Sequence, residues 1–92
     1  MSWINSRVNR KEAAKHLKEG GRICIQFHIS LKRPFGVVTP VPLPYNSTTY
    51  SYECSMIKDK VYFDADRALR DTVLALTKGD FEEIEEIELH AC

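Results

Sequence analysis

The sequence lacks a long apolar segment, a recognisable leader and a cysteine framework. Its most apolar run, FGVVTPVPLP, contains three prolines and is far shorter than the roughly 20 residues of a membrane-spanning helix. No charged stretch followed by an apolar stretch and a small-residue cleavage site stands at the N-terminus. The three cysteines, Cys24, Cys54 and Cys92, form no C-x-x-C pair, which favours reduced thiols over disulfides. We therefore expect a cytoplasmic protein with no membrane partner.

Catalytic and metal-binding motifs are missing as well. The chain has no G-x-S-x-G, no G-x-x-x-x-G-K-[ST] and no H-E-x-x-H. Cys24 and His28 share a face of an expected strand, but four strand residues span about 13 Å, too far for two ligands of one zinc ion. His90 and Cys92 are closer in sequence, yet ordinary core and surface roles explain them better. We expect no enzyme, no metal, no cofactor and no small-molecule substrate.

Length and composition indicate one globular domain covering residues 1–92. With 43% hydrophobic and 28% charged residues, the chain is long enough to bury roughly 60–65% of its unfolded surface. Residues 9–19, NRKEAAKHLKE, begin with Asn9 and place Glu12 three positions later, the spacing of a helical capping box that Gly20 ends. Residues 22–31 then alternate strictly between apolar and polar, which predicts a long half-buried strand.

The middle of the chain contains all four prolines. Residues 32–45 therefore predict an extended connector rather than a strand, and no two of these prolines have the P-x-x-P spacing of an SH3 ligand. Residues 48–56 alternate again, with Tyr50 and Tyr52 on the apolar face. A turn at Lys58-Asp59 is expected to join this strand to residues 61–63 in a hairpin.

The last third predicts a helix and a final strand. Asp64 or Asp66 caps a helix that Gly79 ends. The tail recurs every three residues like a helix and also alternates like a strand, and we choose a strand over residues 84–90. The fold class expected is therefore α+β, a two-layer single domain with the order α-β-β-β-α-β. Its sheet is mainly antiparallel, with two helices on one face.

Charge is strongly polarised although the formal net charge is zero. Residues 1–33 carry eight cations against two glutamates, and residues 61–92 carry nine carboxylates against three cations. The basic candidates for partner or nucleic-acid binding are Arg7, Arg10, Lys11, Lys15, Lys18, Arg22, Lys32 and Arg33. The acidic candidates for partner binding are Glu82, Glu83, Glu85, Glu86 and Glu88. Internal pairing would make these charges structural, whereas separation would create two recognition surfaces.

Lys11, Lys15 and Lys18 are the best candidate site. At about 100° per residue they lie on one face of the first helix, where each like-charged pair costs about 0.2–0.5 kcal/mol in an isolated helix. A solvated surface tolerates this arrangement, but the row also suits the phosphates of a nucleic-acid backbone. Base recognition is harder to support, because the expected open face of the sheet is polar and lacks the aromatic rings of an RRM.

Two resemblances follow from these patterns. The α-β-β-β-α order over residues 9–77 resembles a double-stranded-RNA-binding domain, but the second helix opens with the acidic DADRALRD and the Gly-Pro-x-His-type loop is missing, which removes that family's main phosphate site. The short length, the opposed charged ends and the missing catalytic constellation resemble the small phage-encoded inhibitors of the anti-CRISPR type.

The anti-CRISPR resemblance implies stoichiometric binding to a CRISPR ribonucleoprotein. Cationic side chains would then meet guide RNA, or acidic ones would meet the Lys and Arg residues that hold DNA. Two alternatives stay open. One is a stand-alone module that binds an RNA or DNA backbone, and the other is an accessory protein whose charged ends pair head to tail in a homodimer.

Overall fold

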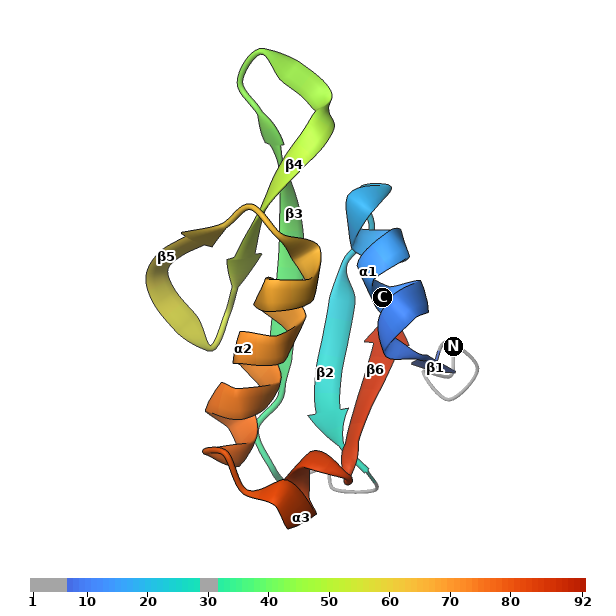
Figure 1. Ribbon diagram of the computed structural model, residues 1–92, viewed down its shortest axis with the longest axis vertical. Helices are drawn as coiled ribbons and strands as arrows, with labels where there is room; N and C mark the ends of the chain where they lie inside the picture. The colour runs from blue at the N-terminus through green and yellow to red at the C-terminus, as the bar shows by residue number, and fades with distance from the viewer. Residues whose placement is uncertain (1–6, 29–31) are drawn as a thin grey trace.

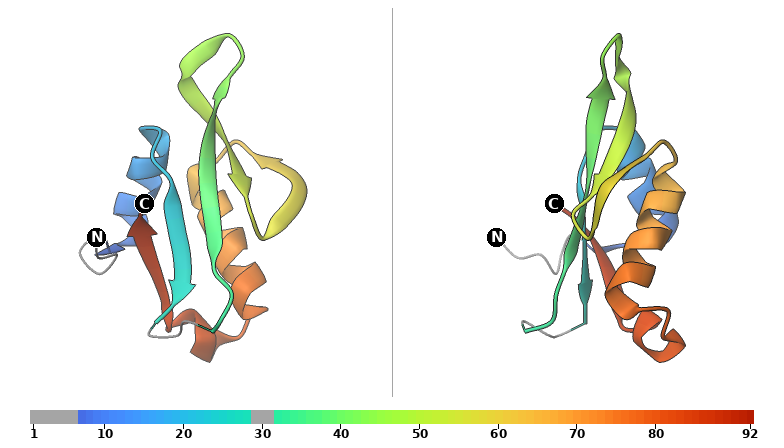
Figure 2. Two further views of the ribbon diagram at one scale, coloured as in Figure 1. Left: turned by 180° about the vertical axis from the view of Figure 1, so that it is seen from behind. Right: turned by 90° about the vertical axis from the view of Figure 1, so that its left-hand side faces the viewer.

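The computed structural model describes residues 7–28 and 32–92, and shows one antiparallel sheet covered on one face by helices (Figure 1; Figure 2). The elements in chain order are β1 (Arg7–Val8), α1 (Arg10–Lys18), β2 (Ile23–Phe27), β3 (Gly36–Leu43), β4 (Asn46–Cys54), β5 (Ile57–Tyr62), α2 (Ala65–Thr77), α3 (Phe81–Ile84) and β6 (Ile87–Ala91). The six strands have the order β1-β6-β2-β3-β4-β5. The two-layer α+β class is confirmed, but the expected order α-β-β-β-α-β omitted β1, β3 and α3.

The hydrophobic core lies between the sheet and the helices. Ile23, Ile25 and Phe27 of β2 are at most 2% exposed, as their alternation predicted. They pack in one cluster with Leu17 of α1 and Leu69 of α2. The strand itself ends at Phe27 and His28 lies in a turn, so the predicted strand was too long, and its residues 29–31 lie outside the described part of the chain.

The prediction of a proline connector over residues 32–45 is wrong, because β3 lies inside the sheet between β2 and β4. The Ser55 N–H donates to the Val37 carbonyl, so odd-numbered β3 residues bond to β4 and even-numbered ones face β2. The pairing with β2 stops at Val38. Pro40 and Pro42 therefore face an open edge, where a missing N–H breaks no ladder bond.

The hairpin of β4 and β5 forms, but not through the expected turn. The two strands are joined at Ser55 and Met56, which precede β5. The predicted turn residues lie in a bulge instead, because the register jumps from Cys54↔Ile57 to Glu53↔Val61. Asp59 in this bulge has the left-handed φ of 62°.

Both long helices begin where their capping residues predicted. The Asn9 Oδ1 accepts a hydrogen bond from the Glu12 N–H at 2.8 Å, and the Glu12 Oε1 accepts one from the Asn9 N–H at 2.9 Å. Asp64 rather than Asp66 caps α2, since its Oδ1 accepts from the Asp66 N–H at 3.0 Å. Gly20, with a φ of 94°, supplies the left-handed residue after α1.

The tail contains both structures between which its pattern was ambiguous. Asp80 caps the short α3, and the strand begins only at Ile87, so the choice of a strand starting at residue 84 was partly wrong. β6 then inserts between β1 and β2, with Leu89 opposite both Val8 and Ile25. The end of the chain consequently lies beside the start of β2, where the Cys92 N–H donates a hydrogen bond to the Arg22 carbonyl at 3.1 Å.

The prediction of reduced thiols is also wrong for two of the three cysteines. Cys24 and Cys92 form a disulfide with a Cα–Cα distance of 6.1 Å, although 68 residues separate them in sequence. The pairing of β6 with β2 brings them together, because Cys24 lies opposite His90, two residues before Cys92. Cys54 is free and buried. No helix in residues 7–28 and 32–92 has the length and apolar character needed to cross a membrane.

Two phenylalanines provide a matched test of this core. Phe27 is 2% exposed, whereas Phe63 is 75% exposed. Phe27→Ala leaves a cavity and should lower the free energy of unfolding by about 3–5 kcal/mol, while Phe63→Ala should change it by about 0.5 kcal/mol or less. Urea denaturation measures both. Equal losses for the two variants would contradict this arrangement of faces.

Candidate functional site

The exposed face of α1 carries three lysines with no acidic partner. Lys11, Lys15 and Lys18 are all exposed, and the described part of the chain contains no ion pair to any of them. They line a shallow depression of about 730 Å³ that is completed by Arg10, Glu12, Ala14 and Asp66. We call Lys11, Lys15 and Lys18 the lysine face. Among the described residues, it places three cations without an ion pair on one helix.

The other predicted basic residues do not all join the lysine face. Arg10 borders it, and Arg22 follows the end of α1, before β2 begins. Lys32 and Arg33 lie beyond the opposite end of β2, where Arg33 forms an ion pair with Glu83 of α3. Arg7 on β1 forms an ion pair with Glu88, with 3.4 Å between Arg7 Nη1 and Glu88 Oε2. The set of eight predicted cations is therefore divided among three places in the fold.

The acidic tail is partly neutralised by the basic third of the chain. Arg33 Nη2 lies 3.0 Å from Glu83 Oε1, and Arg33 Nη1 lies 3.7 Å from Glu86 Oε2. The same guanidinium stacks on the Phe27 ring, with its carbon 3.6 Å from the ring centroid. Glu82 and Glu85 are exposed and have no ion pair within the described residues. The five predicted glutamates thus do not form one free recognition surface.

Glu88 is the most enclosed of these glutamates. Its carboxylate accepts hydrogen bonds from Arg7 at 3.4 Å and from His90 at 3.0 Å, and it also contacts the Nδ1 of His28. Burial raises the pKa of Glu88, but the hydrogen bonds from His28 and His90 and the charge of Arg7 bring this pKa below its ordinary value. Glu88 therefore ties β1, the turn after β2 and β6 together rather than facing a partner.

Cys54 and Tyr62 have pKa values that are raised by their packing inside the fold. Burial raises the pKa of the Cys54 thiol, whose Sγ lies 3.6 Å from the Ala68 carbonyl oxygen. Burial and the hydrogen bond to Asp71 raise the pKa of Tyr62 to about 12. The Tyr62 hydroxyl donates that bond at 2.7 Å and holds β5 against α2. A thiol or phenol kept protonated in this way is a poor nucleophile.

A cleft beside the lysine face is the feature that the sequence interpretation missed. It has a volume of about 340 Å³ and is lined by Lys18, Thr48, Thr49, Tyr50, Tyr52, Phe63, Asp64 and Ala65. We call it the aromatic cleft. It lies on the helix side of the sheet, where the end of α1, the middle of β4 and the start of α2 meet. The sequence predicts a polar open face without aromatic rings, and the alternation of residues 48–56 places Tyr50 and Tyr52 on the helix side instead.

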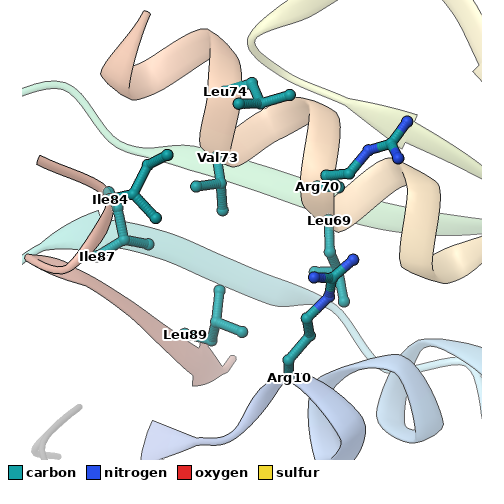
Figure 3. Close-up of a pocket in the computed structure, with 8 residues that line it drawn as sticks. All are labelled: Arg10, Leu69, Arg70, Val73, Leu74, Ile84, Ile87 and Leu89. Atoms are coloured by element: carbon teal, nitrogen blue, oxygen red, sulfur yellow. The ribbon is translucent and has the colours of Figure 1, made fainter. Parts of the chain in front are cut away.

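A second cleft is lined mainly by apolar side chains. Leu69 and Val73 of α2 face Ile84, Ile87 and Leu89 across it, Leu74 completes the lining, and Arg10 and Arg70 flank one end (Figure 3). Its volume is about 320 Å³. Arg70 forms an ion pair with Asp71, with 3.6 Å between Arg70 Nε and Asp71 Oδ1. This cleft shares Arg10 with the depression over the lysine face but contains none of the three lysines.

Within residues 7–28 and 32–92, no group of three or more His, Cys, Asp or Glu side chains is placed to hold a metal ion. The likeness to a double-stranded-RNA-binding domain does not hold, because four strands rather than three lie between α1 and α2. Comparison with protein-family models, with curated proteins and with solved structures finds no match to this chain.

The lowered pKa of Glu88 gives a prediction for stability against pH. A carboxyl whose folded pKa lies below its unfolded value of about 4.5 stabilises the fold above that value and loses this contribution as the pH falls through the folded pKa. Glu88→Gln should therefore lower the free energy of unfolding near neutral pH, and its difference from the wild type should shrink in acid. Urea denaturation across this range measures it, with the exposed Glu85→Gln as control. A difference that is the same at neutral and acid pH would contradict this assignment.

Proposed function

We propose that the protein is a non-enzymatic binding protein that contacts a nucleic-acid backbone through the lysine face of α1. By occupying this backbone within a nucleoprotein, it blocks the binding of the nucleoprotein's nucleic-acid target. The observation that supports the proposal most is that ion pairs within the fold involve the acidic tail but not the lysine face. Glu83, Glu86 and Glu88 pair with arginines of the same chain. Among the described residues, Lys11, Lys15 and Lys18 have no such pair.

The geometry of the lysine face suits phosphates. Lys11 to Lys18 span about 10 Å along the helix axis, the length of about three nucleotides in one strand of B-form DNA. Each lysine contributes a compact point charge on a flexible stem, which favours backbone contact over the reading of base edges. Lys15 and Lys18 also lie in the last turn of α1, where the helix dipole favours cations and reduces the cost of their mutual repulsion.

The specific form of the proposal is inhibition of a CRISPR ribonucleoprotein, as the resemblance to small phage-encoded inhibitors implies. The lysine face would then meet guide RNA, and the exposed Glu82 and Glu85 are available for basic side chains of the protein component. The site of action would be the bacterial cytoplasm, where disulfides are rare. The fold does not rely on the Cys24–Cys92 bond alone, because five backbone pairs join β2 to β6 independently of it.

Charge reversal on α1 tests the proposal. In the variant Lys11→Glu/Lys15→Glu/Lys18→Glu, affinity for a purified CRISPR ribonucleoprotein and for single-stranded RNA should fall, because each lost contact no longer releases a counterion. The slope of log K against log salt should become shallower by about 0.7–0.9 per lost contact. Fluorescence anisotropy over a range of salt concentrations gives both quantities.

The matched control reverses three exposed cations elsewhere, Lys58→Glu/Arg67→Glu/Lys78→Glu, and so changes the net charge equally. This control should bind nearly as the wild type does. Unchanged binding by the α1 variant, with its fold confirmed by circular dichroism, would end the case for the lysine face. Wild-type binding to bare RNA that is as tight as binding to the ribonucleoprotein would instead favour the stand-alone backbone-binding module.

A further inference from the structure

The lysine face and the aromatic cleft form one continuous surface. Lys18 lines both the depression over α1 and the cleft, and the first residues of α2 also border each of them, Ala65 in the cleft and Asp66 in the depression. A polymer whose charged groups follow α1 from Lys11 to Lys18 would therefore reach the cleft at its next unit.

The aromatic side chains of the cleft differ in how firmly they are held. Tyr52 is buried at 4% exposure and lines the inner wall. Tyr50 is half-buried against the end of α1, where a Cβ added to Gly20 would come within 2.7 Å of the tyrosine hydroxyl oxygen. Phe63 lies between β5 and α2 and is 75% exposed. The cleft thus has one buried ring, one half-buried ring and one ring that is open to solvent.

Exposed aromatic rings beside cations are the pattern by which proteins hold single-stranded nucleic acids. A base stacks on an aromatic ring while lysines contact the phosphates, and the contact tolerates any sequence because every base has a π face. The cleft also has the hydroxyls of Thr48 and Thr49 and the carboxylate of Asp64, which are potential partners for the polar edge of a base. The carboxylate opposes a phosphate at the same place, so the cleft suits a base better than it suits a backbone group.

We propose that the aromatic cleft takes an unpaired nucleobase that stacks on Phe63, with Tyr50 beside it. The ligand of the lysine face is then single-stranded nucleic acid rather than a duplex, whose bases are paired and stacked within the helix. This inference rests on the proposed function, because it assigns the phosphates of the same strand to Lys11, Lys15 and Lys18.

Two probes separate the base from the phosphates. A fluorescently labelled oligothymidylate carries both, whereas inorganic polyphosphate carries phosphates alone. Phe63→Leu removes the aromatic ring at an exposed position and should lower the affinity for oligothymidylate by roughly tenfold. It should leave the binding of polyphosphate unchanged. The wild type should also bind oligothymidylate more tightly than a duplex of equal length in the same salt.

Phe81→Leu is the matched control, because Phe81 is 85% exposed on α3 and lies away from the cleft. It should bind both probes as the wild type does. Equal affinity of the wild type and Phe63→Leu for oligothymidylate would overturn the stacking proposal and leave the lysine face intact. An equal loss on polyphosphate would also overturn it. If the wild type binds neither probe, both the stacking proposal and the proposed function fail.

Discussion

The insertion of β6 between β1 and β2 is the constraint on which the rest of the structure depends. This antiparallel pairing returns the end of the chain to its beginning, and it places Leu89 between Val8 and Ile25 on the core side. On the open side the same register puts Glu88 next to Arg7 and His28. It also brings Cys92 within reach of Cys24. One strand therefore sets the core, the buried carboxylate and the disulfide together.

The insertion of β6 also determines which charges remain for a partner. Because α3 precedes β6 directly, Glu83 and Glu86 lie where Arg33 can pair with both. The tail and the basic third of the chain thus neutralise each other only in part, through Arg7 and Arg33 and not through α1. The helix α1, which carries the lysine face, lies apart from α3 and alongside β2 and β6 (Figure 1). In its described part, a chain with zero net charge consequently presents an uncompensated cationic surface on α1.

Sequence patterns within a few residues predicted the helices and strands whose formation depends on neighbouring residues. The capping box of Asn9 and Glu12 and the alternation around Ile25 identified α1 and β2, since capping and burial of one strand face act within a few residues. The prolines of β3 led to the wrong prediction of a connector. A strand can contain them because the pairing of β3 with β2 ends at Val38, before Pro40 and Pro42. Neither the disulfide nor the aromatic cleft could be predicted, because each joins segments that only the strand order brings together.

The candidate site also has a part that the sequence predicts and a part that depends on the strand order. The helical spacing of Lys11, Lys15 and Lys18 was sufficient to predict the lysine face, but the pairing of Glu88 with Arg7 required the position of β6. The central claim is that the lysine face lies against a nucleic-acid backbone. Lysine acetylation rates, followed by mass spectrometry with and without a bound ribonucleoprotein, test it most directly. Lys11, Lys15 and Lys18 should become protected while Lys58 and Lys78 keep their rates. Protection confined to Lys58 and Lys78, or equal at all five lysines, would contradict the claim.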